Sequence, residues 1–235
     1  MHYWLVMPAA GSGRRFGGDT PKQYLFLGKA RVIERALAPF IADARCKGIC
    51  IALDASDEVF STLPPAGDPR VRTVAGGARR CDSVRNALAA LPASDGDWVL
   101  VHDAARPCLA RTDIDRLLAE AGTDEIGGLL AVPLADTLKR AQADVSPAGA
   151  ARVAETPPRT DVWRALTPQM FRAGLLREAL RAAVEAGREP TDESQALEWL
   201  GHAPRLVSGD PGNLKITTLA DMRLAAAWLA RENQP

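Results

Sequence analysis

The sequence predicts an α/β fold in which helices cover both faces of a doubly wound, mostly parallel sheet. Short apolar runs alternate along the chain with segments whose apolar residues recur at helical spacing. The runs are apolar on both faces, as the buried strands of a parallel sheet are. The chain has 235 residues, of which 47% are hydrophobic and 25% charged. That size and composition suit one large domain with a sizeable core.

The expected elements of the first half follow in order from these runs. Strands are expected at 3–7, 48–53, 71–74, 98–102 and 128–132, and helices at 31–42, 80–91 and 112–121. In the last of these helices Thr112 is a candidate N-cap and Asp113 a first-turn acid. Ligands of such sheets bind beyond the carboxyl ends of the strands, so the loops that follow the strands are the candidate functional segments.

The alternation stops at about 133–160, where the segment is polar and rich in small residues. A hairpin projecting from the domain fits its length better than a structureless loop. Helices are then expected at about 173–186, 193–200 and 219–231, with a short strand at 205–207. The chain shows no internal repeat or linker, so residues 1–235 are expected to form a single domain with a projecting β-arm.

Charge and composition exclude several classes of function. The chain carries 29 basic and 29 acidic side chains, a balance that argues against a broad nucleic-acid surface. Its N-terminus has no signal-peptide pattern, and no stretch approaches the roughly 18 to 20 apolar residues of a membrane helix. The four cysteines form no CxxC pair and the three histidines are dispersed, unlike a zinc site. We therefore expect a cytoplasmic protein with neither nucleic-acid nor membrane partners.

The strongest local signal follows the first expected strand, where PAAGSGRR at 8–15 precedes Pro21 and Lys22. Small residues allow close approach of the backbone, and successive amide groups can form an anion-binding nest. Arg14, Arg15 and Lys22 add positive charge. The alternatives are a plain turn or a dinucleotide-binding loop, but GxGxxG fails at Phe16 and no GxxxxGK[ST] motif is present. The pattern favours phosphate binding.

A second signal is GGARRCDS at 76–83, between an expected strand and an expected helix. Its glycine-supported backbone and the Ser83 hydroxyl could contact a base, although two glycines before a helix are common. Arg79 and Arg80 suit a solvated helix end as well as they suit ligand contacts. Alone, this motif decides little.

A third signal is VHDAARP at 101–107, where Asp103 follows a strand. A carboxylate beyond the end of a strand is well placed to hold Mg²⁺, which prefers oxygen ligands. The alternative is that Asp103 caps the following turn. Arg106, beside it, is favoured as a functional residue.

Seven motifs considered together are more specific than any one of them. PAAGSGRR with PKQY, GGxxRxxSV, VHDAARP, DTLKR, LTPQ, TDES and NLKIT run from Pro8 to Thr217. In this order they resemble the 2-C-methyl-D-erythritol 4-phosphate cytidylyltransferases of the non-mevalonate isoprenoid pathway. The resemblance implies a Rossmann-like nucleotidyltransferase fold, with Mg²⁺ or another divalent cation as cofactor and CTP as co-substrate. It also implies transfer of CMP to a polyol phosphate, 2-C-methyl-D-erythritol 4-phosphate, to give 4-diphosphocytidyl-2-C-methyl-D-erythritol and pyrophosphate.

The resemblance also assigns roles to individual residues. The catalytic set, which would grip the triphosphate and the reacting groups, is Arg15, Lys22, Arg159 and Lys215. The nucleotide-binding set is Pro8, Ala9, Ala10, Gly11, Gly13, Arg14, Gly77, Ser83, Asp103 and Ala104, and Asp103 would also hold the metal. The set for the sugar phosphate is Arg106, Thr137, Arg159, Thr167 and Thr191. Thr137 and Arg159 lie in the arm, which in this family crosses to a second subunit, so the resemblance implies a homodimer.

The chain departs from the family pattern at two positions. Some members have an aspartate where this chain has Ala78, and some have an acidic residue where Gly212 precedes Asn213. Asp210 is a candidate replacement for the latter. In TDES at 191–194, capping of a helix is favoured over a direct role in the site.

Three rival functions remain. A ribitol 5-phosphate cytidylyltransferase would share the chemistry, but DTLKR and Arg159 favour the methylerythritol phosphate. An NAD-dependent oxidoreductase is disfavoured by Phe16. A catalytically silent nucleotide-binding module is disfavoured by the joint presence of Arg15, Lys22 and Lys215.

Overall fold

A computed structural model describes residues 1–11, 20–142 and 151–232, so the predicted phosphate-binding residues Gly13, Arg14 and Arg15 lie outside the described part. Its centre is a seven-stranded sheet of order β11-β7-β10-β6-β1-β4-β5. The strands are β1 (Tyr3–Pro8), β4 (Cys46–Leu53), β5 (Val71–Ala75), β6 (Trp98–Val101), β7 (Gly127–Pro133), β10 (Trp163–Arg172) and β11 (Arg205–Ser208). Four of the six pairings are parallel, and β10 alone in this sheet runs antiparallel to its neighbours β6 and β7. The predicted doubly wound, mostly parallel sheet is confirmed.

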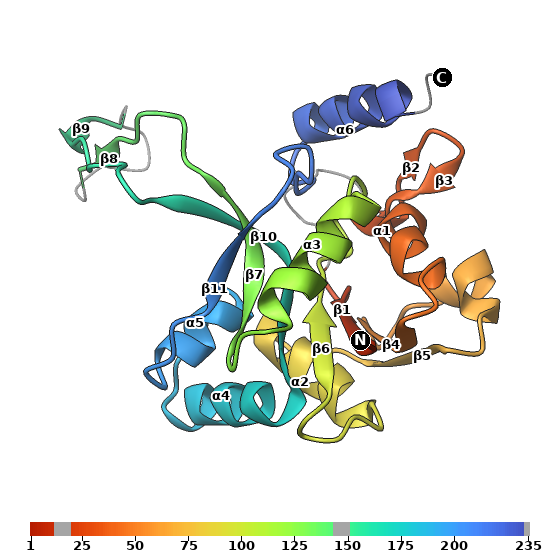
Figure 1. The fold of residues 1–235 in the computed structure, drawn as a ribbon. Coiled ribbons are helices and arrows are strands. Elements are labelled where there is room, and N and C mark those ends of the chain that lie inside the picture. Colours follow the sequence, from red (N-terminus) through yellow and green to blue (C-terminus); the bar gives the residue numbers. More distant parts are fainter. Residues whose placement is uncertain (12–19, 143–150, 233–235) are drawn as a thin grey trace.

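Helices lie on both faces of the sheet (Figure 1). They are α1 (Val32–Ile41), α2 (Arg80–Ala90), α3 (Arg111–Ala121), α4 (Ala173–Glu185), α5 (Glu193–Glu198) and α6 (Leu219–Glu232). Successive side chains of β1 point to opposite faces, as a strand requires. Leu5 and Met7 join the core beneath α1 and α3, and Val6 joins the core beneath α2, α4 and α5. This two-sided burial is why the central strands β1 and β6 are apolar.

The expected strands and helices all occur, with ends that shift by no more than two residues. One detail was wrong: α3 begins at Arg111 after Ala110, which makes no side-chain capping bond, so Thr112 is not its N-cap. Asp113 does lie in the first turn.

Strand β10 is not among the strands expected from the sequence, because Pro168 lies in its middle. Proline has no N–H for a ladder, so it argues against a central strand. Here the register with β7 shifts between Ala165 and Gln169, and the ladder resumes beyond the proline. The LTPQ motif therefore interrupts a buried strand next to the end of β6.

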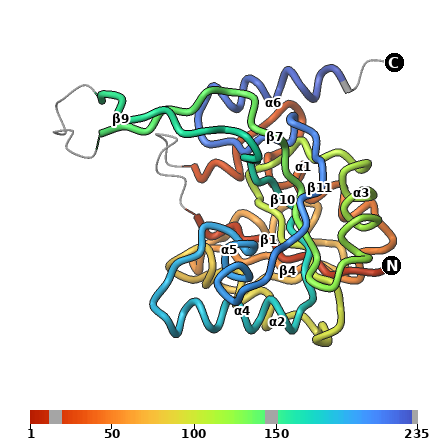
Figure 2. The backbone as a smooth tube through the Cα atoms, turned by 60° about the vertical axis from the view of Figure 1, so that its left-hand side comes forward, coloured from red at the N-terminus to blue at the C-terminus, as the bar shows by residue number. Residues whose placement is uncertain are grey.

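Strands β7 and β10 continue into an arm, described at residues 133–142 and 151–160, that projects from the body of the molecule (Figures 1 and 2). It carries a two-stranded antiparallel sheet, β8 (Arg140–Ala141) with β9 (Val153–Glu155). Leu138 and Val153 on this arm are 39% and 57% exposed, so the arm presents apolar side chains to solvent.

The remaining elements are short. They are the hairpin of β2 (Phe26–Leu27) and β3 (Ala30–Arg31), and the 3-10 helices at Lys22–Tyr24, Phe60–Thr62 and Pro64–Gly67. A third apolar cluster joins Leu27 and Val32 to Leu214, Ile216 and α6. It holds the segment at 213–216 against the body. None of the helices in the described ranges is long and apolar enough to cross a membrane.

Candidate active site

A pocket opens at the carboxyl ends of β1, β5 and β6, where a doubly wound sheet binds its ligands. The loops after these three strands form its walls, and the C-terminal segment closes one side. The predicted site residues that line it are Pro8, Ala9, Ala10, Gly11, Lys22, Gly77, Ser83, Asp103, Ala104 and Lys215.

The first wall is the loop after β1. Gln23, which is buried, donates through Nε2 to the carbonyl oxygens of Ala9 at 2.9 Å and Gly11 at 3.4 Å. The amide N–H of Ala9 donates to Ala52 O on β4 at 2.8 Å. The loop is thus fixed to the sheet and to the 3-10 helix that carries Lys22. Gln23 was not predicted, although it lies within the PKQY motif.

The second wall is the turn before α2, and close packing explains its two glycines. A Cβ at Gly76 would lie 2.4 Å from the Cβ of Ala10, and one at Gly77 would lie 2.3 Å from that of Asp82. The hydroxyl of Ser83 accepts from the N–H of Gly77 at 3.1 Å and donates to Arg79 O at 3.3 Å. The Ser83 hydroxyl therefore organises the turn that faces the pocket.

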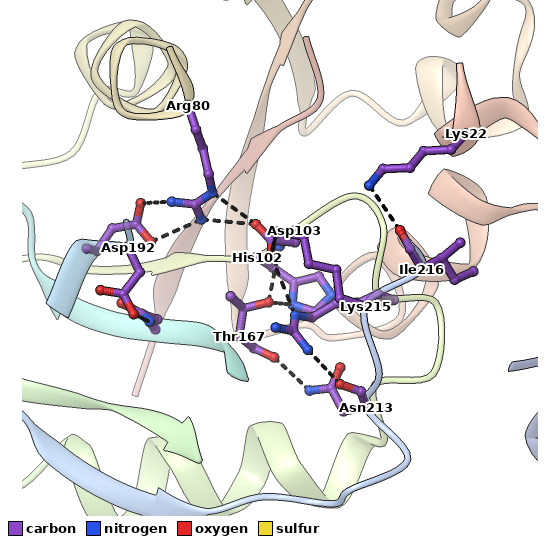
Figure 3. Close-up of polar contacts among 12 residues, drawn as sticks. Lys22, Arg80, His102, Asp103, Thr167, Asp192, Asn213, Lys215 and Ile216 are labelled. Carbon is purple, nitrogen blue, oxygen red and sulfur yellow. Dashed lines mark hydrogen bonds and ion pairs between the residues drawn. The ribbon is translucent and has the colours of Figure 1, made fainter. Parts of the chain in front are cut away.

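Asp103 is the centre of charge in the site (Figure 3). Its side chain is 8% exposed and meets three cations: Arg80 Nη2 lies 3.0 Å from Oδ1, Lys215 Nζ 2.9 Å from Oδ2, and Arg106 Nε 3.6 Å from Oδ2. Burial raises the pKa of this carboxyl, but the three cations outweigh burial and hold its pKa well below the ordinary value. Asp103 is ionised at neutral pH.

Arg80 is a pocket residue that the sequence left undecided. Its guanidinium lies between two carboxylates, Asp103 on one side and Glu193 on the other, with Nη1 2.6 Å from Glu193 Oε1. Its side chain is 27% exposed. Of the two alternatives that the sequence left open, the structure favours a place in the site over a solvated helix end, because α2 directs this side chain into the pocket. Arg80 belongs to the GGxxRxxSV motif and Glu193 to the TDES motif, but no pattern in the sequence indicated that the two side chains are in contact.

The segment at 213–216 brings Lys215 to the pocket and connects it to two walls. Ile216 N donates to Ala105 O at 2.8 Å, and Asn213 Nδ2 donates to Thr167 O at 2.7 Å. Lys22 Nζ donates to Ile216 O at 3.0 Å. The two predicted catalytic lysines therefore come from distant parts of the chain to one side of the pocket.

Behind Asp103 lies a buried network that shapes its turn. Thr167 Oγ1 accepts from the N–H of Asp103 at 3.2 Å and contacts His102 Nδ1 at 2.9 Å. His102 Nε2 lies 3.2 Å from Arg106 O, which can only accept, so Nε2 carries the proton and Nδ1 accepts from Thr167. Burial lowers the pKa of His102 to about 4, so the ring is neutral near pH 7. Thr167, predicted to contact substrate, is buried in this network.

Arg106 is also largely buried, and its Nη1 donates to Asn213 O at 2.8 Å. Burial lowers its pKa in spite of the neighbouring Asp103. It therefore joins the Asp103 turn to the C-terminal segment from beneath the pocket. Asn213, which sequence reasoning did not assign a role, is fully buried there.

Three further predicted residues lie away from this pocket within the chain. Thr137 and Arg159 are exposed on the arm, and Thr191 is exposed before α5. The capping role favoured for TDES is confirmed, since Asp192 is the N-cap of α5 and accepts from Gln195 N at 2.9 Å. Asp192 also accepts from Gln169 Nε2 at 2.9 Å, which ties α5 to β10.

The structure shows what surrounds Ala78 and Gly212, the two positions at which the chain departs from the family pattern. Ala78 lines the pocket without a polar side chain. Asp210 accepts from Gly212 N at 2.7 Å within its own turn, and it is not among the residues that line the pocket. A Cβ at Gly212 would lie 2.1 Å from Trp228 Cε2, so the indole of α6 occupies the space that a side chain there would need.

At its carboxyl edge this doubly wound sheet carries a fixed small-residue loop, a buried ionised carboxylate and several cations, an arrangement that suits a nucleotidyltransferase. The family model described as IspD, 2-C-methyl-D-erythritol 4-phosphate cytidylyltransferase, matches residues 3–231. The chain belongs to this family, as the motifs predicted.

Individual relatives are similar to this chain along nearly its whole length. The chain is 50% identical over 236 residues to the 2-C-methyl-D-erythritol 4-phosphate cytidylyltransferase of Ectopseudomonas mendocina (strain ymp), covering 99% of this chain and 98% of the relative. The structure of the Francisella tularensis enzyme of the same name is 31% identical, with a TM-score of 0.82 over 97% of this chain and 100% of that one. The Thermus thermophilus enzyme is 34% identical, with a TM-score of 0.77 over 98% of this chain and 100% of that one.

Proposed function

We propose that this protein transfers CMP from CTP to 2-C-methyl-D-erythritol 4-phosphate and releases pyrophosphate. The observation that carries the proposal is one pocket, at the edge of the sheet where nucleotides bind, that is lined by Lys22 and by ionised Asp103 with its partners Lys215 and Arg80. Membership of the family supports the choice of nucleotide and acceptor.

The chemistry needs charge neutralisation more than proton transfer. A phosphate monoester has a second pKa of about 6, so its oxygen is already a nucleophile at neutral pH. That oxygen attacks the α-phosphorus of CTP; a new P–O bond forms and the bond to pyrophosphate breaks, its electron pair leaving with pyrophosphate. A general base is not required, and the neutral, buried His102 is consistent with this. Catalysis then consists of positioning and of stabilising the added negative charge.

The cations have distinct places in this scheme. Lys22 is held by Ile216 O and Lys215 by Asp103, so both ammonium groups are directed toward the pocket before any ligand enters. They would contact the triphosphate and the charge that develops at the α-phosphorus. Arg15, assigned the same role by resemblance, and its neighbours Gly13 and Arg14 belong to the same proposed phosphate site.

Backbone groups would recognise the nucleotide. Ala78 offers no side-chain hydrogen bond, and the Ser83 hydroxyl is used within its turn. The base would therefore be contacted chiefly by main-chain groups of the turn at 76–83 and by Ala104. The loop at 8–11, fixed by Gln23, would lie along the triphosphate.

The residues fit a divalent cation. Asp103 is ionised and is the carboxylate that lines the described pocket, and Mg²⁺ at nucleotide sites commonly takes one or two carboxylates together with phosphate oxygens and water. Lys215, which contacts Oδ2, has a side chain 39% exposed and can move aside. A bound Mg²⁺ would offset triphosphate charge.

The arm supports a shared active site in a homodimer. Thr137 and Arg159 are exposed on it, and it extends away from the body that contains their own pocket (Figure 2). These residues would bind the acceptor phosphate in the pocket of a second copy. Arg106, Thr167 and Thr191 would support that acceptor site from the receiving subunit. The proposal places the enzyme in the cytoplasm, where CTP is made.

Pyrophosphate release tests the proposal. The assay contains CTP, Mg²⁺ and either 2-C-methyl-D-erythritol 4-phosphate or ribitol 5-phosphate. Release with the first alone is expected. Preference for ribitol 5-phosphate would overturn the acceptor, and silence with both would indicate a nucleotide-binding module without catalysis.

A further inference from the structure

Glu193 is a buried carboxylate whose position the proposed reaction does not explain. It is the first residue of α5, and its side chain is 1% exposed. A buried charge is costly unless it is paired and hydrogen-bonded. Its partner is Arg80, which comes from the start of α2 and lines the pocket.

Arg80 connects this carboxylate to Asp103. Nη1 and Nη2 lie 2.6 and 3.2 Å from the two oxygens of Glu193, while Nε and Nη2 lie 3.1 and 3.0 Å from Oδ1 of Asp103. A guanidinium is planar and rigid, so fixing one edge on Glu193 fixes the direction of the edge that faces Asp103. Lysine could not make both contacts in this geometry.

The arrangement separates the two oxygens of Asp103. Arg80 occupies Oδ1, whereas Lys215 at 2.9 Å and Arg106 at 3.6 Å meet Oδ2. The orientation of the carboxylate therefore depends on where Arg80 is held. A rotated Asp103 would also displace Lys215, which is one of the two lysines directed at the phosphates.

We propose that Glu193 is a positioning residue: it holds Arg80 on one oxygen of Asp103, so that the other oxygen and Lys215 face the nucleotide phosphates. The inference rests on the proposed function for the identity of the phosphates. It assigns to the TDES motif a role beyond the capping of α5.

The attachment of α5 does not require this carboxylate. Asp192 caps the helix and accepts from Gln169, and Ser194 N donates to Gln169 Oε1 at 2.8 Å. These bonds already fasten the start of α5 to β10. The side chain of Glu193 instead contacts Arg80 of α2, which lines the pocket, as expected of a residue that acts on the site.

The test compares Glu193→Gln with a matched buried carboxylate outside the pocket. The glutamine keeps the shape and one hydrogen bond but loses the charge that holds Arg80. We expect kcat to fall on the order of tenfold, because small misplacement of catalytic groups is enough for such losses, while the Kd for CTP changes less than about twofold. The control is Asp43→Asn: Asp43 is equally buried and paired with Arg45, but it precedes β4, away from the pocket. It should lower Tm and leave kcat unchanged.

A double-variant experiment separates positioning from general destabilisation. If Glu193 acts through Arg80, Glu193→Gln should add no further loss of kcat to Arg80→Met. Multiplicative losses would overturn the proposal, as would a Glu193→Gln enzyme with lowered Tm and unchanged kcat. Should Glu193→Gln fail to fold, Arg80→Lys gives the same information, since it keeps the charge but cannot bridge both carboxylates; wild-type kcat in this variant contradicts the proposal.

Crystal structures of the variants test the positioning role of Glu193 without relying on enzyme activity. In Glu193→Gln, or in Arg80→Lys, Asp103 is expected to turn away from its wild-type orientation. Unmoved Asp103 and Lys215 would overturn the inference even if the wild-type protein proved silent with both sugar phosphates. A displaced Asp103 in a silent protein would support the positioning role and refute the proposed reaction alone.

Discussion

Lys22 Nζ donates to the carbonyl oxygen of Ile216 across a sequence separation of 194 residues, at 3.0 Å (Figure 3). Ile216 in turn donates its N–H to Ala105 O, in the turn that carries Asp103. One short backbone segment thus sets the positions of both lysines relative to the buried carboxylate. Because this hydrogen bond is accepted by a main-chain carbonyl, its loss leaves a neutral group at Ile216 O without its donor.

Lys22→Ala should therefore depress turnover without unfolding the protein. Loss of one well-aimed cation is expected to cost on the order of 3 kcal/mol of transition-state stabilisation, or about a hundredfold in kcat. Steady-state pyrophosphate release and thermal unfolding check the two halves of the prediction. Lys29→Ala, at an exposed lysine on the neighbouring hairpin, is the control and should behave as wild type. Wild-type turnover in a folded Lys22→Ala sample would refute the catalytic role.

The sequence predicted the alternating elements because their signals are local. Apolar runs and helical spacing located the ends of β1 and α2, and glycines marked the turns. Strand β10 was not predicted because Pro168 argues against a strand in the local sequence, whereas its pairing with β6 and β7 is a tertiary contact. The role of Glu193 was not predicted because its partner Arg80 lies 113 residues away, and only the packing of α5 against the sheet brings the two side chains together. Local pattern therefore identified the loops of the site, while its ionic network required the tertiary structure.

Gly212 should not tolerate the acidic residue found in some relatives. A side chain there would meet Trp228, whose Cε2 would lie 2.1 Å from the new Cβ. Because overpacking typically costs about 1–3 kcal/mol, we expect Gly212→Asp to lower the free energy of unfolding by about 2 kcal/mol. Urea unfolding provides the measurement. Gly67→Ala, where a Cβ meets nothing within 4 Å, is the control.

The clash itself can be tested by opening the space. In the background of Trp228→Ala, which leaves a void under α6, Gly212→Asp should cost much less than it costs in the wild type. Equal costs in the two backgrounds would show that the indole is not what requires glycine at this position.

Asp43 should make stability depend on pH in the acid range. Burial raises its pKa, but hydrogen bonds from Arg45 and Tyr3 outweigh burial and lower the pKa from 3.8 to about 2. The unfolded chain then binds the proton more readily, so this contribution is present above about pH 4 and is lost as the pH falls toward about 2. The shift corresponds to about 2 kcal/mol. The stability gap between wild type and Asp43→Asn should shrink by that amount between about pH 5 and pH 2 in urea titrations; a constant gap would contradict the assignment.

The arm gives the sharpest prediction, because a shared site can be restored by mixing two inactive proteins. Arg159→Ala should raise the KM for the sugar phosphate and leave the Kd for CTP unchanged, since Arg159 is exposed on the arm and does not line the pocket of its own chain. Arg152→Ala, at another exposed arginine of the arm, is the matched control. In a heterodimer of Lys22→Ala and Arg159→Ala, the first protomer supplies an intact arm and the second an intact pocket. One of the two sites is then complete, so each heterodimer should recover up to about half of the wild-type activity, and a statistical mixture after subunit exchange up to about a quarter. If pocket and arm acted within one chain, both sites would stay defective and no activity would return, which would also remove the argument for the homodimer.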